Sequence, residues 1–326
     1  MQTATALRVS MIVSMAFAAT SADAGRVRVS QEMEGVGMVV RGFVETFDRS
    51  SMTAEQVYAY DSDAPECQFS YGGNAFLPEP NATVMAVVDT WEGRTLFVVH
   101  GSTGCFGDES VRGAAMMSFD LRFGDGMACL VEDDQDEADC GGDATITTDH
   151  VWLDNRTDGL VLGALDDRWQ LDASFTEPPT GTSGVVVRSD GDGEVGGLST
   201  DRTIRFDNVI EVGVDVQPGA EVGCLNIDGN GVVPVAILGA AGFDVGEINI
   251  DTLALAGMLV RVRGNGEHQC AIEHVNGDDH PDLACHFFDD PDAWTPGESK
   301  AAVWGEFWDT APFYGEDLVC VVGSPS

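Results

Sequence analysis

The segment TVMAVVDTWEGRTLFVVHG, residues 83–101, decides the fold. Two runs of apolar and β-branched residues flank Glu92 and Gly93, where the chain can reverse direction. Strand-forming residues on both sides of a glycine-containing turn predict a β-hairpin. Neither run shows the periodicity of an amphipathic helix. The hairpin is therefore the first strand pair of an expected sheet.

Similar runs recur along the rest of the chain, separated by Gly, Asp and Asn. Further strands are expected at 35–47, 114–123, 144–153, 159–165, 168–175 and 203–212. A short helix is expected near 51–58, where Thr53 is placed to cap AEQVYAY. Residues 176–184 and 189–197 have the composition of loops. The pattern predicts an all-β fold with two β-sandwich-like domains, predominantly antiparallel and stapled by disulfides.

Residues 1–24 have the pattern of a cleaved secretory signal peptide. A weakly basic start precedes an apolar core at 9–19, and the small residues Ala22 and Ala24 lie before the expected cleavage site. The apolar core is shorter than the roughly 20 residues that a spanning helix requires. We expect a secreted or periplasmic protein without membrane insertion. The length favours two domains, an N-terminal sandwich at 25–207 and a C-terminal sandwich at 208–326.

The chain is strongly acidic, with a formal net charge of −39, and Lys300 is its only lysine. Such a surface repels nucleic acids and anionic membranes, so neither is expected as a partner. A dense shell of carboxylates is typical of proteins in a saline or calcium-rich exterior, where salt screens the repulsion between like charges. A cationic partner is the alternative interpretation.

All eight cysteines follow the expected cleavage site, four in each half. An even number in an exported chain favours disulfides over thiolate chemistry. The favoured pairings are Cys129–Cys140, Cys67–Cys105, Cys270–Cys285 and Cys224–Cys320, although four cysteines permit three pairings in each half. If 269–275 pairs with 282–288 in the register that places Cys270 opposite Cys285, the two cysteines lie at a distance suited to a disulfide. Two-residue alternation then places Ile272, Leu283 and Phe287 on the same, buried face.

Several motifs of the second half occur together in one known family. They are VGVDVQPG (212–219), GVVPVAILG (231–239), EHVNGDDHPDL (273–283), a His-Phe pair at 286–287 and the final segment 295–322. Residues ~208–322 thereby resemble a β-domain, often C-terminal, of exported bacterial proteins that has no established activity. VPVAILG is the specific part of the resemblance. The first half shows no such resemblance.

The family pattern E-D-V-N-G-D-G-x-x-D-L suggests calcium binding, and this chain departs from it at two positions. His274 stands where Asp is usual, and Asp279 stands where Gly is usual. A cysteine pair of the family's last hairpin is replaced by Ala302 and Glu316. The resemblance therefore implies calcium as the cofactor, through a modified loop.

The residues of this loop permit two interpretations. Calcium requires six to eight oxygen ligands, which the side chains of Asn276, Asp278 and Asp282 and the backbone carbonyl of His280 could begin to supply. Asp279 could adopt the left-handed conformation of the usual glycine. Imidazole at position 274, however, is a poor ligand for a hard cation. Alternatively, Asn276 and Gly277 form a plain hairpin turn with positive φ at both residues. The two interpretations stay open.

Other patterns point less clearly to chemistry. The sequence contains no Gly-x-Ser-x-Gly, no His-Glu-x-x-His and no phosphate-binding loop. Histidines at 268, 274, 280 and 286 would be a zinc site only if they converged. Five tryptophans, at 152, 169, 294, 304 and 308, are either core anchors or a sugar-stacking platform.

We therefore expect a non-catalytic structural or adhesive protein of the cell exterior, with calcium as the candidate stabilising cofactor. Its partner would be an extracellular glycan or a cell-surface protein. The first alternative is a carbohydrate-binding module or a carbohydrate-active enzyme. A periplasmic metal-binding factor is the second.

Overall fold

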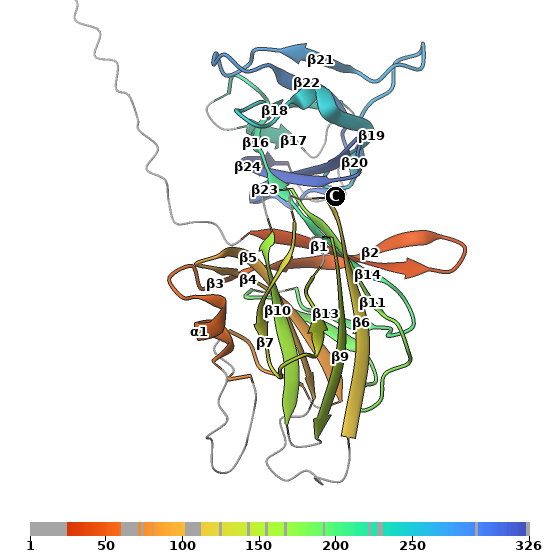
Figure 1. The fold of residues 1–326 in the computed structure, drawn as a ribbon. Coiled ribbons are helices and arrows are strands. Elements are labelled where there is room, and N and C mark those ends of the chain that lie inside the picture. The colour runs from red at the N-terminus through yellow and green to blue at the C-terminus, as the bar shows by residue number, and fades with distance from the viewer. Residues whose placement is uncertain are drawn as a thin grey trace, which may run out of the picture.

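The computed structural model describes residues 25–59, 71–72, 75–79, 81–101, 112–123, 126–141, 144–153, 156–165, 168–191, 193–220, 223–226, 231–290 and 293–323. Strands dominate these residues (Figure 1), which confirms the all-β fold class. Among the strand pairs of this part of the chain, four are parallel and the others antiparallel. The expected helix is α1 (Ala54–Tyr58), and Thr53 caps it with a complete capping box.

The strands before Val209 form two seven-stranded sheets, together called the N-terminal sandwich. Sheet A contains, in spatial order, β2 (Gly37–Glu45), β1 (Arg26–Met33), β14 (Ile204–Asn208), β11 (Gln170–Phe175), β6 (Arg112–Phe123), β9 (Thr145–Leu153) and β8 (Ala138–Asp139). Sheet B contains β13 (Val195–Leu198), β12 (Val185–Arg188), β4 (Ala82–Thr90), β5 (Gly93–Gly101), β10 (Thr157–Leu165) and β7 (Ala128–Glu132), and β3 (Phe47–Asp48) pairs with β4.

The hairpin expected from residues 83–101 is the pair β4–β5. Thr90 lies opposite Gly93, whose φ of 102° allows the tight reversal. One face of this hairpin contributes Met85 and Val98 to a core that is shared with sheet A. Its other face packs, through residues such as Phe97, under α1. Burial on both faces explains why the two runs are apolar almost throughout.

The strands after Val209 form the C-terminal sandwich. Sheet C contains β15 (Ile210–Glu211), β24 (Pro312–Val322), β23 (Gly297–Phe307), β19 (Ile248–Leu255) and β20 (Met258–Leu259), and β17 (Gly223–Asn226) pairs with β24. Sheet D contains β16 (Gly213–Val216), β18 (Val232–Leu238), β22 (Asp282–Phe288) and β21 (Cys270–Glu273). A 3-10 helix, η1 (Val245–Glu247), precedes β19. Ile237 and Phe287 of sheet D meet Val303 and Phe313 of sheet C in one core.

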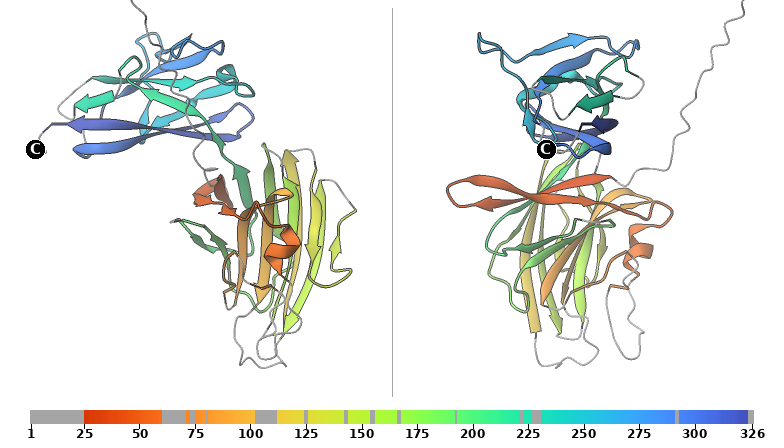
Figure 2. Two further views of the ribbon diagram at one scale, coloured as in Figure 1. Left: turned by 90° about the vertical axis from the view of Figure 1, so that its left-hand side faces the viewer. Right: turned by 180° about the vertical axis from the view of Figure 1, so that it is seen from behind.

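The two sandwiches meet at the hairpin β1–β2, which lies across the junction (Figures 1 and 2). The segment 203–212, expected as one strand, is two strands: β14 belongs to sheet A and β15 to sheet C. Strand β1 was not expected from the sequence, because Arg26 and Arg28 interrupt its apolar residues. Val27 and Val29 are nevertheless fully buried. Ion pairs described below explain how Arg28 is buried beside them.

Candidate functional site

The acidic segment 273–287 is a hairpin with the expected register. Cys270 lies opposite Cys285, and Glu273 lies opposite Asp282. The connection, however, is a loop of residues 274–281 and not a two-residue turn. Gly277 has a φ of 77°, whereas Asn276 does not have positive φ. The interpretation as a plain Asn-Gly turn with positive φ at both residues is therefore wrong.

Side-chain oxygens hold this loop in shape. Asn276 Oδ1 accepts from the Asp278 amide at 3.0 Å, and Asp278 Oδ1 accepts from the His280 amide at 2.7 Å. The hydrogen bond from the His280 amide lowers the pKa of Asp278 most, and the bond that Asn276 Nδ2 donates to Asp278 Oδ2 lowers it further. Asp279 is exposed and does not adopt the expected left-handed conformation, because Gly277 already supplies the reversal.

Asp282 is fully buried and fastens the loop to the sheet. Its Oδ2 accepts from the Val275 amide at 2.6 Å, and its Oδ1 accepts from the Gly239 amide, just after β18, at 3.0 Å. His274 Nδ1 donates to the His280 carbonyl at 3.2 Å. That carbonyl is the one expected to bind calcium, so the imidazole lies beside the place of the cation.

Three disulfides join the described cysteines, and they are the three expected pairings. Cα–Cα distances are 4.1 Å for Cys270–Cys285, 4.5 Å for Cys224–Cys320 and 5.9 Å for Cys129–Cys140. The fourth expected pair, Cys67–Cys105, lies outside the described residues.

Ile272 lies directly opposite Leu283 and shares its face as expected, but the expectation that Ile272 is buried there is wrong. Ile272 is 56% exposed, while Leu283 and Phe287 are buried. Strand β21 is the edge strand of sheet D, and its own side chains are half or fully exposed. Cys285, on β22, is buried in the core, and the half-buried Cys270 packs against that core.

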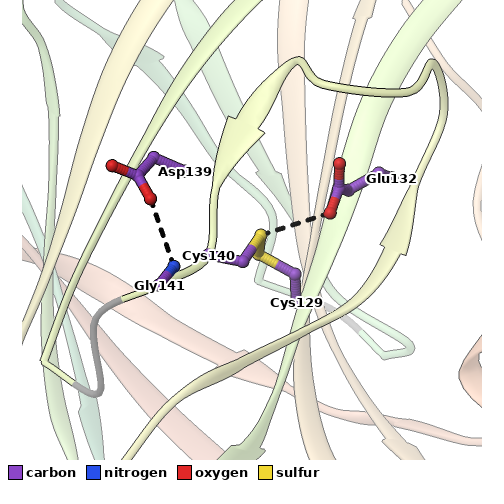
Figure 3. The surroundings of a disulfide bond; sticks show 5 residues. All are labelled: Cys129, Glu132, Asp139, Cys140 and Gly141. Atoms are coloured by element: carbon purple, nitrogen blue, oxygen red, sulfur yellow. Dashed lines mark hydrogen bonds between the residues drawn. A yellow bond between two sulfur atoms is a disulfide. The ribbon is translucent and has the colours of Figure 1, made fainter.

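Cys129–Cys140 connects the two sheets of the N-terminal sandwich (Figure 3). Cys129 belongs to β7, at the edge of sheet B, and Cys140 directly follows β8, at the edge of sheet A. The acidic connection between these strands is therefore closed at its base. Glu132 lies at its exposed surface, with Oε1 3.4 Å from Cys140 Sγ. Because both sulfurs are in the disulfide, this group offers no thiolate to a metal.

Glu137, in the same connection, belongs to a polar cluster that the sequence did not predict. His150 Nδ1, on β9, donates to Asp158 Oδ1, on β10, at 3.1 Å. Glu137 Oε2 lies 3.5 Å from the same nitrogen. The cluster therefore joins sheet A, sheet B and the disulfide-closed connection. An acidic stretch such as 133–143 is usually a solvated loop, but Glu137 instead lies against the buried imidazole of His150.

A second histidine lies beside this cluster. His100, on β5, is directly opposite Thr83 on one side and Asp158 on the other. Its Nδ1 and the Thr83 hydroxyl share a hydrogen bond of 2.8 Å. The His100 ring stacks on Trp152 with centroids 5.1 Å apart and lies 5.0 Å from the His150 ring. Both histidines are almost completely inaccessible to solvent.

The surroundings of the two histidines shift their pKa values in opposite directions. Burial opposes protonation of His150, but hydrogen bonds and charges from Asp158 and Glu137 outweigh it and raise its pKa to about 9. Burial, assisted by the charge of His150, lowers the pKa of His100 well below its usual value. Burial also raises the pKa of Asp158, although His150 acts in the opposite direction. At neutral pH, His150 is charged and His100 is neutral.

One sequence signal could have identified this cluster. In β9, Ile146, Thr148, His150 and Trp152 alternate with exposed residues. A titratable side chain on the inward face of an alternating strand needs a polar partner in the core. Asp158 supplies that partner from the other sheet, so only the packing of the two sheets reveals the pair.

A cleft of about 550 Å³ lies at the junction of the two sandwiches. Its lining comes from β1, β2, β19 and the hairpin β23–β24, and includes Arg26, Phe43, Glu45, Trp304, Glu306 and Tyr314. Phe43 and Trp304 meet edge to face at 6.3 Å. The Arg26 guanidinium lies 3.8 Å from the centre of the Tyr314 ring. Both sandwiches thus contribute aromatic side chains to one opening.

Arginines hold the junction together. Arg28 Nε donates to the buried Asp207 at 2.9 Å, while its other nitrogens pair with Glu306 and reach the Thr310 carbonyl at 3.2 Å. Arg168 forms an ion pair of 2.6 Å with Asp309. Arg28, Arg168 and Asp207 belong to the N-terminal sandwich. Their partners Glu306, Asp309 and Thr310 belong to the C-terminal sandwich. These bonds fix the cleft between the two parts.

The five tryptophans considered in the sequence divide between core and surface. Trp152, Trp169 and Trp294 are buried. Trp304 is 43% exposed in the cleft, and Trp308 is 68% exposed at the turn after β23. The histidines at 268, 274, 280 and 286 do not form a cluster. Among the described residues, groups of three potential metal ligands occur only around Cys129 and around His150.

No helix in the described part of the chain is both long and apolar enough to cross a membrane.

Comparisons with known proteins do not identify a family for this chain. A scan against protein-family models finds no match, and a search of the curated proteins finds no similar chain.

Proposed function

We propose that this chain is an exported, non-catalytic adhesive protein that binds a saccharide in the cleft between its two sandwiches. The cleft carries this proposal. Its volume of about 550 Å³ is within the usual range for small-ligand sites, roughly 300–1,000 Å³. Phe43, Trp304 and Tyr314 line the cleft and offer aromatic surface to the apolar side of a sugar. Glu45 and Arg26 offer an acceptor and donors to its hydroxyl groups.

Other observations support the location outside the cell. The three disulfides fit an extracellular protein. The net charge of −39 suits a saline exterior. Ala302 and Glu316, which replace the cysteine pair of the similar bacterial β-domain, lie directly opposite each other in β23–β24. This arrangement supports the proposed relation of residues ~208–322 to that domain.

Trp304→Ala is expected to weaken saccharide binding by about 2 kcal/mol, roughly 30-fold, because a central aromatic contact is lost. A glycan array identifies the ligand, and calorimetric titration measures its affinity for wild type and variant. Trp91→Ala is the matched control, because Trp91 is 76% exposed at the β4–β5 turn and does not line the cleft. Equal losses in the two variants would remove the cleft from the proposal, as would an array that retains no glycan.

We also propose that the loop 274–281 binds calcium weakly, because His274 occupies the usual position of a carboxylate. His274→Asp is expected to tighten calcium binding at least tenfold, about 1.4 kcal/mol. The calcium-induced rise in melting temperature should increase accordingly. His268→Asp adds the same charge outside the loop and serves as control. If both variants respond equally to calcium, the loop is not the binding site.

A further inference from the structure

We propose that the buried cluster of the N-terminal sandwich binds one divalent transition-metal ion, zinc fitting best, with His150, Asp158 and Glu137 as its protein ligands. This site is independent of the cleft and of the loop 274–281. It lies between sheets A and B, where β9, β10 and the disulfide-closed connection meet.

The separations among the three ligand atoms suit a tetrahedral zinc ion. Bonds of about 2.0–2.1 Å place neighbouring ligands of a tetrahedron about 3.3–3.4 Å apart. His150 Nδ1 lies 3.1 Å from Asp158 Oδ1 and 3.5 Å from Glu137 Oε2. All three atoms lie within 4.8 Å of one another. Small side-chain adjustments would bring them to one ion, with a fourth corner for water.

The donor set of the cluster suits a dication. Asp158 has a side chain only 4% exposed, and Glu137 lies against the same imidazole. Two carboxylates and one imidazole thus converge away from water, where carboxylates need a charged or hydrogen-bonding partner. The formal charge of a dication matches that of two carboxylate ligands.

One buried ligand atom of this cluster has no hydrogen-bond donor among the described residues. It is Glu137 Oε2, which lies 3.5 Å from His150 Nδ1. The second oxygen of Asp158 accepts from the Val151 amide at 2.9 Å, which orients the carboxylate toward His150. The Asp149 amide donates to the Glu137 carbonyl at 2.8 Å and holds its backbone in place. Such supporting bonds are typical around metal ligands.

The donor types select the class of metal. One imidazole nitrogen and two carboxylate oxygens are normal ligands of zinc. Calcium and magnesium prefer oxygen ligands alone. An ion here would connect both sheets and the acidic connection, and would stabilise the end of the sandwich.

The test uses the full mature chain after treatment with a chelator. Zinc is titrated calorimetrically with excess calcium present, which occupies exposed carboxylates elsewhere on this acidic protein. We expect one tight zinc site per chain, and at least a tenfold loss of affinity for Glu137→Gln and Asp158→Asn. Glu132→Gln is the matched control, because Glu132 is an exposed carboxylate of the same connection. Cobalt absorption in the visible range reports the coordination independently of stability.

The outcomes decide the proposal. One site that is weakened by Glu137→Gln and unaffected by Glu132→Gln supports it, together with a tetrahedral cobalt spectrum that Glu137→Gln alters. The absence of a stoichiometric zinc site overturns the proposal. Equal zinc affinity of Glu137→Gln and Glu132→Gln also overturns it, and would assign the bound zinc to the acidic surface. If Asp158→Asn does not fold, Glu137→Gln still decides, because Glu137 belongs to a connection at the sheet edges.

Discussion

Replacing Cys224 and Cys320 together by serine is expected to lower the free energy of unfolding of the C-terminal sandwich by about 4–5 kcal/mol. The two residues are 96 positions apart and lie opposite each other in the parallel pair β17–β24. Their bond restricts almost the whole C-terminal sandwich in the unfolded state. Loss of a closed loop of this length releases a large conformational entropy on unfolding.

The matched control is the serine double variant of Cys270 and Cys285, which closes a span of only 15 positions. Its expected loss is smaller, about 3 kcal/mol. Denaturant unfolding followed by segment-resolved hydrogen exchange separates the C-terminal strands from β4 and β5, which should keep their protection. A larger loss in the control than in the Cys224–Cys320 variant would contradict the expectation.

Arg28→Met is expected to cost about 3–5 kcal/mol, because it leaves a buried carboxylate without its charged partner. Asp207 is almost fully buried, and burial raises its pKa even though Arg28 acts to lower it. The substitution also removes the bonds to Glu306 and to the Thr310 carbonyl, which connect the two sandwiches. The junction should therefore loosen while each sandwich keeps its own core.

Small-angle scattering and denaturant unfolding measure these two effects. Adding Asp207→Asn to Arg28→Met should recover part of the stability, because the uncompensated charge is removed, but not the compact junction. Arg41→Ala, at an exposed position of the neighbouring strand β2, is the control and should change stability by less than about 0.5 kcal/mol. A scattering profile for Arg28→Met equal to that of the control would show that Arg28 does not hold the junction.

The candidate sites could be predicted only where their residues are close in sequence. The pairing of Cys270 with Cys285 follows from two-residue alternation and one assumed register, both of which the structure contains. The position of the loop between them was predicted correctly, but the backbone conformation within the loop was not. Gly277 and not Asp279 has positive φ, and the Asp282 carboxylate accepts from the amides of Gly239 and Val275. That contact joins two strands distant in sequence.

The buried cluster and the cleft could not be predicted in this way. Glu132 and Glu137 are alike in sequence and only five positions apart. One is exposed and the other reaches His150, because the connection crosses from sheet B to sheet A. Similarly, Trp304 is half-exposed in the cleft and Trp169 is buried. With 55 acidic residues in the chain, composition cannot select the few that fold inward.

The sequence by itself determined the all-β class, the strand-forming hairpin at 83–101, the capped helix at 53–58 and the pairing of Cys270 with Cys285. All of these depend on backbone preferences and alternation over short spans. The tertiary structure alone decided which carboxylates meet histidines, which arginines are buried and where the two sandwiches form a cleft. The physical reason is that burial and charge pairing arise between sheets, from residues that the chain brings together only after every strand has found its neighbour.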